Sequence, residues 1–105
     1  MTTTVVLLFL VSCGPQKPKY KFCARLDLVN RTVGVACYLD KTGVVADKSM
    51  ADYIERHYGG DASEADGLKQ YCGMIKRNAD AGLSREDAIE NAEASFKSAA
   101  CPDDD

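Results

Sequence analysis

The residues of this 105-residue chain best suited to do chemistry are its cysteines. One of the five, Cys13, lies in the apolar N-terminal segment, which leaves four spaced through the rest of the chain. The four are Cys23, Cys37, Cys72 and Cys101. An even set in a short exported chain is typical of a disulfide framework, and free thiols are disfavoured in an oxidising compartment. A zinc site is disfavoured because no two of the four have the short spacing of zinc ligands. We predict two disulfides, and four cysteines leave three pairings open.

His57 is the only histidine and a weak candidate metal ligand. A metal site needs several donors, and the chain offers it only carboxylates such as Asp52 and Glu55, or the distant acidic tail. Its position four residues after Tyr53 favours a packed or partly exposed structural histidine. No serine has a recognisable partner acid, and the cysteines should be paired, so nucleophilic catalysis is not expected. We predict that the protein is not an enzyme.

Asn30-Arg31-Thr32 matches the pattern for N-glycosylation, which matters if the chain is exported. The alternative is a chance match, which is common for so short a pattern. Asn30 follows the apolar Val29 and could lie at the edge of a buried face. The sequence therefore leaves the occupancy of Asn30 open.

Residues 1–13 are interpreted as a signal peptide. The apolar run Val5–Val11 is followed by small residues and is far shorter than the roughly 20 residues that span a bilayer. A cleaved secretory signal fits this pattern, although no Lys or Arg precedes the run. We expect cleavage after Cys13, a mature N-terminus at Gly14 and a secreted protein. The alternative is a bacterial lipoprotein in which Cys13 carries the lipid.

The net charge of -3 equals the charge of the three C-terminal aspartates, Asp103, Asp104 and Asp105. The rest of the chain is therefore near neutral, and residues 102–105 are expected to form a solvated acidic tail. Nucleic-acid binders and cationic lytic peptides need a clear basic excess. We expect no nucleic-acid partner, no stable membrane insertion after signal cleavage, and a monomer.

The mature chain divides into an extended lead-in at 14–22, rich in proline, and one helical, disulfide-stapled domain at 23–101. Apolar residues recur at helical intervals and predict helices over 24–39, from about Asp47 or Ser49 to Tyr58, from Ser63 to about Asn78, and from Ser84 to Cys101. A short strand over 42–45 and an extra turn over 79–83 are alternatives. We predict an all-α fold, a small disulfide-stapled bundle of four to five short helices.

One face of each predicted helix should be buried. Its members are Leu26, Val29, Val33, Ala36 and Cys37 in the first helix, Met50, Tyr53, Ile54, His57 and Tyr58 in the second, Leu68, Tyr71, Cys72 and Ile75 in the third, and Ile89, Ala92, Phe96 and Ala99 in the fourth. The aromatic residues could line a pocket, as in helical carriers of odorants or lipids. In so small a domain, aromatics at helical spacing are more often core.

The surroundings of the four cysteines resemble those in the microplusin family, small antimicrobial proteins secreted into the haemolymph of ticks. Lys21–Leu39 has two cysteines with a helix between them, and Tyr71–Asp105 has an alanine-rich helix that ends at an Ala-Cys step before a polar tail. The resemblance implies about five helices and pairing of the outermost cysteines inward. Carried over, it implies Cys23–Cys101 and Cys37–Cys72, with the family's inner disulfide absent.

The resemblance also implies a function, bacteriostasis through the sequestration of copper by histidines. In the family these histidines lie near the N-terminus, in the last helix and in the tail, whereas this chain has GPQKPKYK, Ser95 and three aspartates there. Copper binding through imidazole is therefore disfavoured. We predict a secreted host-defence protein, with metal sequestration as one mechanism. The alternative is a secreted binding protein for a small apolar ligand or for a host or microbial target.

Overall fold

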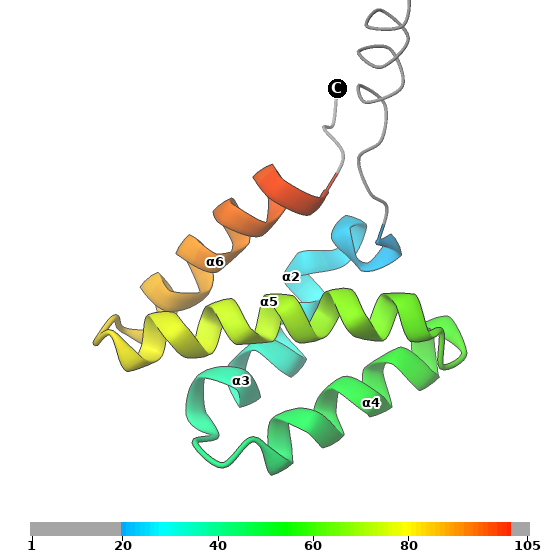
Figure 1. Ribbon diagram of the computed structural model, residues 1–105, viewed down its shortest axis with the longest axis horizontal. Coiled ribbons are helices and arrows are strands. Elements are labelled where there is room, and N and C mark those ends of the chain that lie inside the picture. The colour runs from blue at the N-terminus through cyan, green and yellow to red at the C-terminus, as the bar shows by residue number, and fades with distance from the viewer. Residues whose placement is uncertain (1–19, 102–105) are drawn as a thin grey trace, which may run out of the picture.

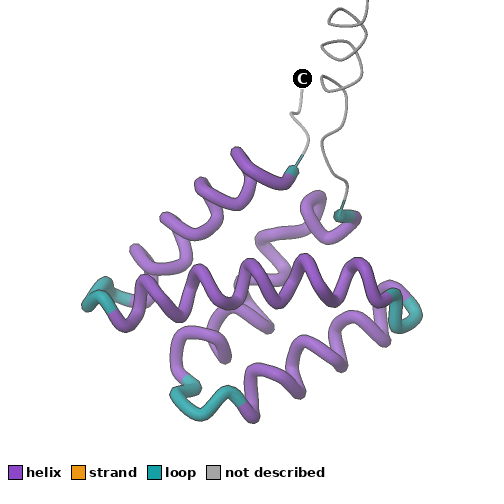
Figure 2. The backbone as a smooth tube through the Cα atoms, in the orientation of Figure 1, coloured by secondary structure: helices purple, strands orange, loops and turns teal. Residues whose placement is uncertain are grey.

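The computed structural model describes residues 20–101, and within them every regular element is a helix (Figures 1 and 2). An N-terminal segment of short helices consists of η1 (Lys21–Arg25), α2 (Leu26–Val29), the π-helical η2 (Asn30–Gly34) and α3 (Val35–Leu39). Three longer helices follow: α4 (Val44–Tyr58), α5 (Ala62–Asp80) and α6 (Arg85–Ala100). The predicted all-α, disulfide-stapled bundle is confirmed. The predicted signal peptide, the cleavage site, most of the lead-in and the acidic tail lie outside the described residues.

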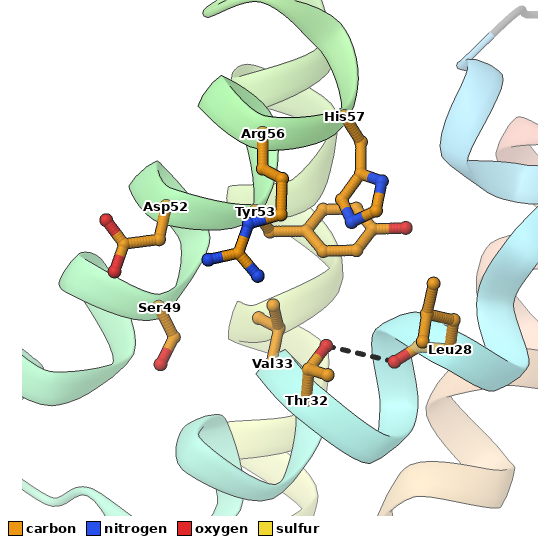
Figure 3. Close-up of a pocket in the computed structure, with 8 residues that line it drawn as sticks. All are labelled: Leu28, Thr32, Val33, Ser49, Asp52, Tyr53, Arg56 and His57. Atoms are coloured by element: carbon orange, nitrogen blue, oxygen red, sulfur yellow. Dashed lines mark hydrogen bonds between the residues drawn. The ribbon is translucent and has the colours of Figure 1, made fainter.

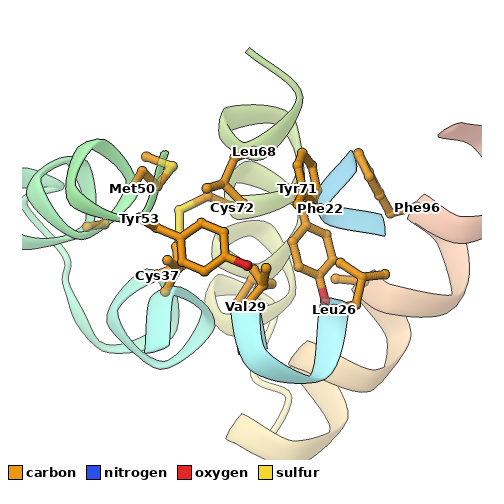
Figure 4. Close-up of a cluster of buried hydrophobic side chains, with 14 of the residues drawn as sticks. Phe22, Leu26, Val29, Cys37, Met50, Tyr53, Leu68, Tyr71, Cys72 and Phe96 are labelled. Atoms are coloured by element: carbon orange, nitrogen blue, oxygen red, sulfur yellow. A yellow bond between two sulfur atoms is a disulfide. The ribbon is translucent and has the colours of Figure 1, made fainter. Parts of the chain in front are cut away.

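Helix α5 crosses the middle of the bundle and contacts α6 on one side, α4 on the other, and the N-terminal segment behind it (Figure 1). Its own buried face, which follows the predicted 3.6-residue spacing, is therefore the centre of the core. Figure 4 shows the side chains that meet there from all these helices. They include Phe22, Leu26, Val29, Cys37, Met50, Leu68, Tyr71, Cys72, Ile75 and Phe96.

Two disulfides cross-link this bundle, one near the two ends of the described chain and one at its centre. Cys23 in η1 bonds to Cys101 just after α6, and Cys37 in α3 bonds to Cys72 in α5, with Cα separations of 5.8 and 5.5 Å. This is the pairing that the family resemblance implies. The bonds close loops with sequence separations of 78 and 35 residues, so each secures contacts between helices far apart in the chain.

The first predicted helix was wrong as one continuous α-helix over 24–39. The chain is already helical at Lys21, two residues inside the predicted extended lead-in, and it passes through 3-10, α and π geometry before it ends at Leu39. Gly34 is the residue of this stretch with the lowest helix propensity, and it ends the π-helical turn. The buried positions were nevertheless predicted correctly, because a helix with local changes of pitch still presents Leu26, Val29 and Val33 to the core.

Helix α4 begins at Val44, three or more residues before the predicted N-cap at Asp47 or Ser49, and residues 42–45 do not form a strand. The cause is Asp40, whose Oδ2 accepts hydrogen bonds from the backbone N–H groups of Val45 at 2.7 Å and Ala46 at 3.0 Å. A carboxylate reaching forward across the turn thus satisfies the first free N–H groups of the helix. Its partners are not spaced as a capping box, so the signal was missed.

Acid should weaken this cap. The hydrogen bond from the backbone of Ala46, together with those from Thr42 and Val45, lowers the pKa of Asp40 to about 2 from an ordinary 3.8. The stabilisation is therefore complete above about pH 4 and is lost as the pH falls through about 2. We expect the gap in melting temperature between the wild type and Asp40→Asn to be constant above about pH 4 and to shrink between about pH 4 and pH 2. A gap that stays constant over this range would show that the Asp40 charge does not stabilise the turn.

The other helix ends show the same preference for local hydrogen bonds. Helix α5 is capped by Asp61, which accepts from the backbone of Ser63 at 2.9 Å, so the predicted Ser63 cap was displaced by two residues. Ser84 caps α6 as predicted and accepts from the backbone of Asp87. The short turn considered over 79–83 is present: α5 continues to Asp80, and a tight turn through Gly82, with φ of 97°, follows it.

Candidate functional site

The most site-like feature of residues 20–101 is a cleft between α4 and the N-terminal segment (Figure 3). We call it the Tyr53 cleft. Its larger part, about 370 Å³, is lined by Leu28, Thr32, Val33, Ser49, Asp52, Tyr53, Arg56 and His57. A smaller part, about 180 Å³, is lined by Arg25, Tyr53, His57 and Tyr58. Tyr53 and His57 belong to both parts, so they mark where the two meet.

Tyr53 is the unusual residue of this cleft. Only 6% of its surface is exposed, and its hydroxyl is buried without a hydrogen-bond partner among residues 20–101. In Figure 3 the ring lies across the cleft and carries the hydroxyl to the side between His57 and Leu28. Burial, reinforced by the neighbouring Tyr58 hydroxyl, raises the pKa of Tyr53 to about 12, although Tyr58 does not come within hydrogen-bond distance. The phenol is therefore protonated at neutral pH and can donate a hydrogen bond.

Of the charged groups around Tyr53, the carboxylates form ion pairs and two of the arginines do not. Lys48 lies 3.7 Å from Asp52, and Arg31 lies 3.6 Å from Asp27, so both nearby carboxylates have a cation on their own helical stretch. Arg25 and Arg56 form no ion pair with any of residues 20–101. The cleft therefore has two arginines without an ion-pair partner among the described residues, beside an apolar floor and the carboxylate of Asp52.

His57 lies on the exposed side of α4 and packs against Tyr53, with ring centroids 4.4 Å apart. It is thus neither buried in the core nor surrounded by donors. Residues 20–101 contain no group of three or more His, Cys, Asp or Glu side chains arranged to hold a metal ion. The companions that the sequence offered, Asp52 and Glu55, do not gather around the imidazole into such a group.

Asn30 lies at a junction of three helical elements. Its Nδ2 donates to Glu93 Oε1 of α6 at 2.8 Å, and its Oδ1 accepts from the hydroxyl of Tyr71 in α5. Burial, reinforced by the charge of Glu93, raises the pKa of Tyr71 well above its ordinary value, so this hydroxyl remains a donor. The sequence marked Asn30 only as a sequon, because the partners of its amide come from distant parts of the chain.

A glycan on Nδ2 would compete with Glu93 for the same atom of Asn30. We therefore expect the folded, secreted protein to carry no glycan at Asn30. Treatment of protein from a eukaryotic secretory host with peptide N-glycosidase should leave its mass unchanged. Loss of a glycan mass would contradict this expectation and would place Glu93 away from Asn30 in solution.

The two tyrosines make a matched pair for mutagenesis, because both are buried and only one has a partner. Tyr71→Phe removes the hydrogen bond to Asn30 and should lower the free energy of unfolding by about 1 kcal/mol. Tyr53→Phe removes a buried hydroxyl that has no partner among the described residues, so the free energy of unfolding should not fall and should rise by about 1 kcal/mol. Urea denaturation of both variants measures the difference. Equal losses would mean that the Tyr53 hydroxyl is bonded in the free protein.

Most of the other aromatic residues form core rather than a pocket. The rings of Tyr20, Phe22 and Phe96 stack at centroid distances of 5.4 to 5.9 Å, and Tyr71 lies 5.2 Å from Phe96. Tyr38 donates to the carbonyl of Leu83 and fastens the turn before α6. The carrier-like pocket considered from the aromatic spacing is thus largely filled by the side chains themselves, whereas Tyr53 lines the cleft described above.

Fold and site together define a small all-helical, disulfide-stapled protein with a shallow cationic and apolar cleft. No helix within residues 20–101 is long and apolar enough to cross a membrane. No family model, curated protein or solved structure matches the chain.

Proposed function

We propose that this chain is a secreted host-defence protein of the microplusin type, which restrains microbial growth. The observation that carries the proposal is the disulfide framework: Cys23–Cys101 encloses Cys37–Cys72 on an all-helical scaffold. This nesting agrees with the pairing implied by the resemblance of the cysteine segments. Two disulfides in so short a chain also favour an oxidising, extracellular compartment.

Copper sequestration does not fit the donor set of the described chain. His57 is its only imidazole, and no group of three potential donors surrounds it or lies elsewhere in residues 20–101. Imidazole is the ligand type that favours copper, whereas isolated carboxylates favour harder cations. We therefore expect growth restraint that does not depend on removing copper from the medium.

A growth assay tests both parts of this proposal. Oxidised protein from a secretory host is added to bacterial cultures at micromolar concentrations, with and without excess copper, beside reduced and alkylated protein as the control. The oxidised form should slow growth in both media, and the reduced form should not. Restoration of growth by copper would assign the activity to chelation. Unchanged growth in every culture would contradict the host-defence function.

A second candidate function, binding of a small ligand, is favoured by one observation. The Tyr53 cleft combines a floor of apolar side chains with a buried hydroxyl that lacks a partner within residues 20–101. Ligand sites in proteins commonly pair an apolar lining with a few convergent polar groups.

A further inference from the structure

The Tyr53 cleft has two chemically different ends. Leu28 and Val33 provide apolar surface in its larger part, whereas its smaller part is walled by Arg25, His57 and Tyr58. Tyr53 lies between the two ends, because it lines both. A ligand that fills both parts must therefore be apolar along its body and polar at one end.

The Tyr53 hydroxyl determines which chemical group the polar end of the ligand must carry. A buried donor without a partner is destabilising, and a ligand oxygen that accepts its hydrogen bond would remove this cost. The phenol is a donor at neutral pH, so the matching group is an acceptor. A carboxylate accepts several hydrogen bonds at once, and bonds to a charged acceptor are stronger than neutral ones.

The charge of Arg25 also favours a carboxylate at the polar end of the ligand. Arg25 lines the smaller part of the cleft, and its charge acts on the Tyr53 phenol in opposition to that of Asp27. The nearest competing carboxylate, Asp27, pairs with Arg31, and Arg25 has no ion-pair partner among residues 20–101. A guanidinium can hold a carboxylate with two parallel hydrogen bonds. The polar end is thus suited to an anion.

We propose that the Tyr53 cleft binds a small amphipathic monocarboxylate. Its carboxylate is held by the Tyr53 hydroxyl and the Arg25 guanidinium, and its apolar body lies over Leu28 and Val33. This inference rests on the ligand-binding candidate above and names the class of ligand. The exposed ring of His57 packs on Tyr53, so a change of its side-chain rotamer opens the hydroxyl to the ligand.

Octanoate and 1-octanol are the probes for this proposal, because they share an apolar chain and differ in the head group. Each is titrated into the isotope-labelled full chain, and amide shifts are followed by NMR. Octanoate should bind saturably and shift amides around Arg25, Leu28, Val33 and Tyr53–Tyr58. Octanol should bind about tenfold more weakly, since a charge-assisted hydrogen bond contributes about 1.5 kcal/mol or more.

Two variants and two matched controls identify the groups. Tyr53→Phe and Arg25→Gln should each weaken octanoate binding about tenfold without a loss of fold. Tyr38→Phe and Arg77→Gln remove the same side-chain types outside the cleft and should leave binding unchanged.

Each remaining outcome contradicts a stated part of the proposal. Equal binding of octanoate and octanol would leave a ligand-binding protein without anion selectivity. No saturable shift with either probe would remove the ligand-binding candidate as well. Unaltered octanoate affinity in Tyr53→Phe would mean that the hydroxyl serves no ligand and that water satisfies it.

Discussion

Replacing Cys37 and Cys72 together by alanine should lower the free energy of unfolding by about 4 kcal/mol. The disulfide closes a loop with a sequence separation of 35 residues, so its removal restores a large amount of chain entropy to the unfolded state. Both cysteines are also buried in the core, where α3 packs on α5. Such a loss is a large fraction of the stability of a domain of this size.

Urea denaturation of the oxidised double variant measures this loss, and the Cys23→Ala/Cys101→Ala double variant is the matched comparison. Its loop, with a separation of 78 residues, is longer, so chain entropy predicts a loss larger by less than about 1 kcal/mol. A loss below about 1 kcal/mol for either pair would show that the helices hold together without that disulfide.

The second large effect is expected at Glu64, which is only 3% exposed although it carries a carboxylate. From α5 it accepts the backbone N–H groups of Lys21 at 2.8 Å and of Phe22 at 3.2 Å, and so caps the first turn of η1. Helix η1 has no side-chain cap of its own at Tyr20. Glu64→Ala leaves both donors without this acceptor and should lower the free energy of unfolding by about 3 kcal/mol.

Hydrogen exchange separates this cause from a general weakening. In Glu64→Ala the amides of Lys21 and Phe22 should lose their protection first, while those in the centre of α5 follow the global stability. Glu90→Ala, which removes an exposed carboxylate from α6, is the control and should change stability by less than about 0.5 kcal/mol. Retained protection at Lys21 and Phe22 would contradict the capping role.

The helices and their buried faces were predictable because both depend on spacing along the chain. Apolar residues at intervals of three and four identify the stripe that faces the core, and this placed Val29, Leu68 and Phe96 correctly. Ala99 was wrong: it is exposed, whereas Ala88 at the other end of α6 is buried. Short alanine side chains give too little hydrophobic contrast for spacing alone to decide which of them faces the core.

The polar contacts could not be predicted, because they join residues that are distant in sequence. Glu64 is 43 residues from Lys21, and Asn30 is 41 residues from Tyr71 and 63 from Glu93. No local pattern marks such pairs, and burial of a glutamate is unexpected from composition. A residue pattern can show that these side chains exist on a helix but not which distant group meets them.

The candidate site shows the same limit. The sequence placed Tyr53 and His57 on one side of a helix and treated them as core or as a weak metal site. The structure instead places Arg25 from η1 at the same cleft, and the missing partner of the Tyr53 hydroxyl becomes visible only when all of its neighbours are known. An unsatisfied donor is a property of the packed molecule.

We propose that this chain is exported and oxidised into the domain that Cys23–Cys101 and Cys37–Cys72 cross-link. Mass spectrometry of the intact protein collected from a secretory host, followed by non-reducing peptide mapping, tests it most directly. We predict the mass of residues 14–105 less the hydrogens of two disulfides, with each bond recovered in its own linked peptide. A retained N-terminal segment, free thiols, or Cys23 linked to Cys37 or Cys72 would contradict it.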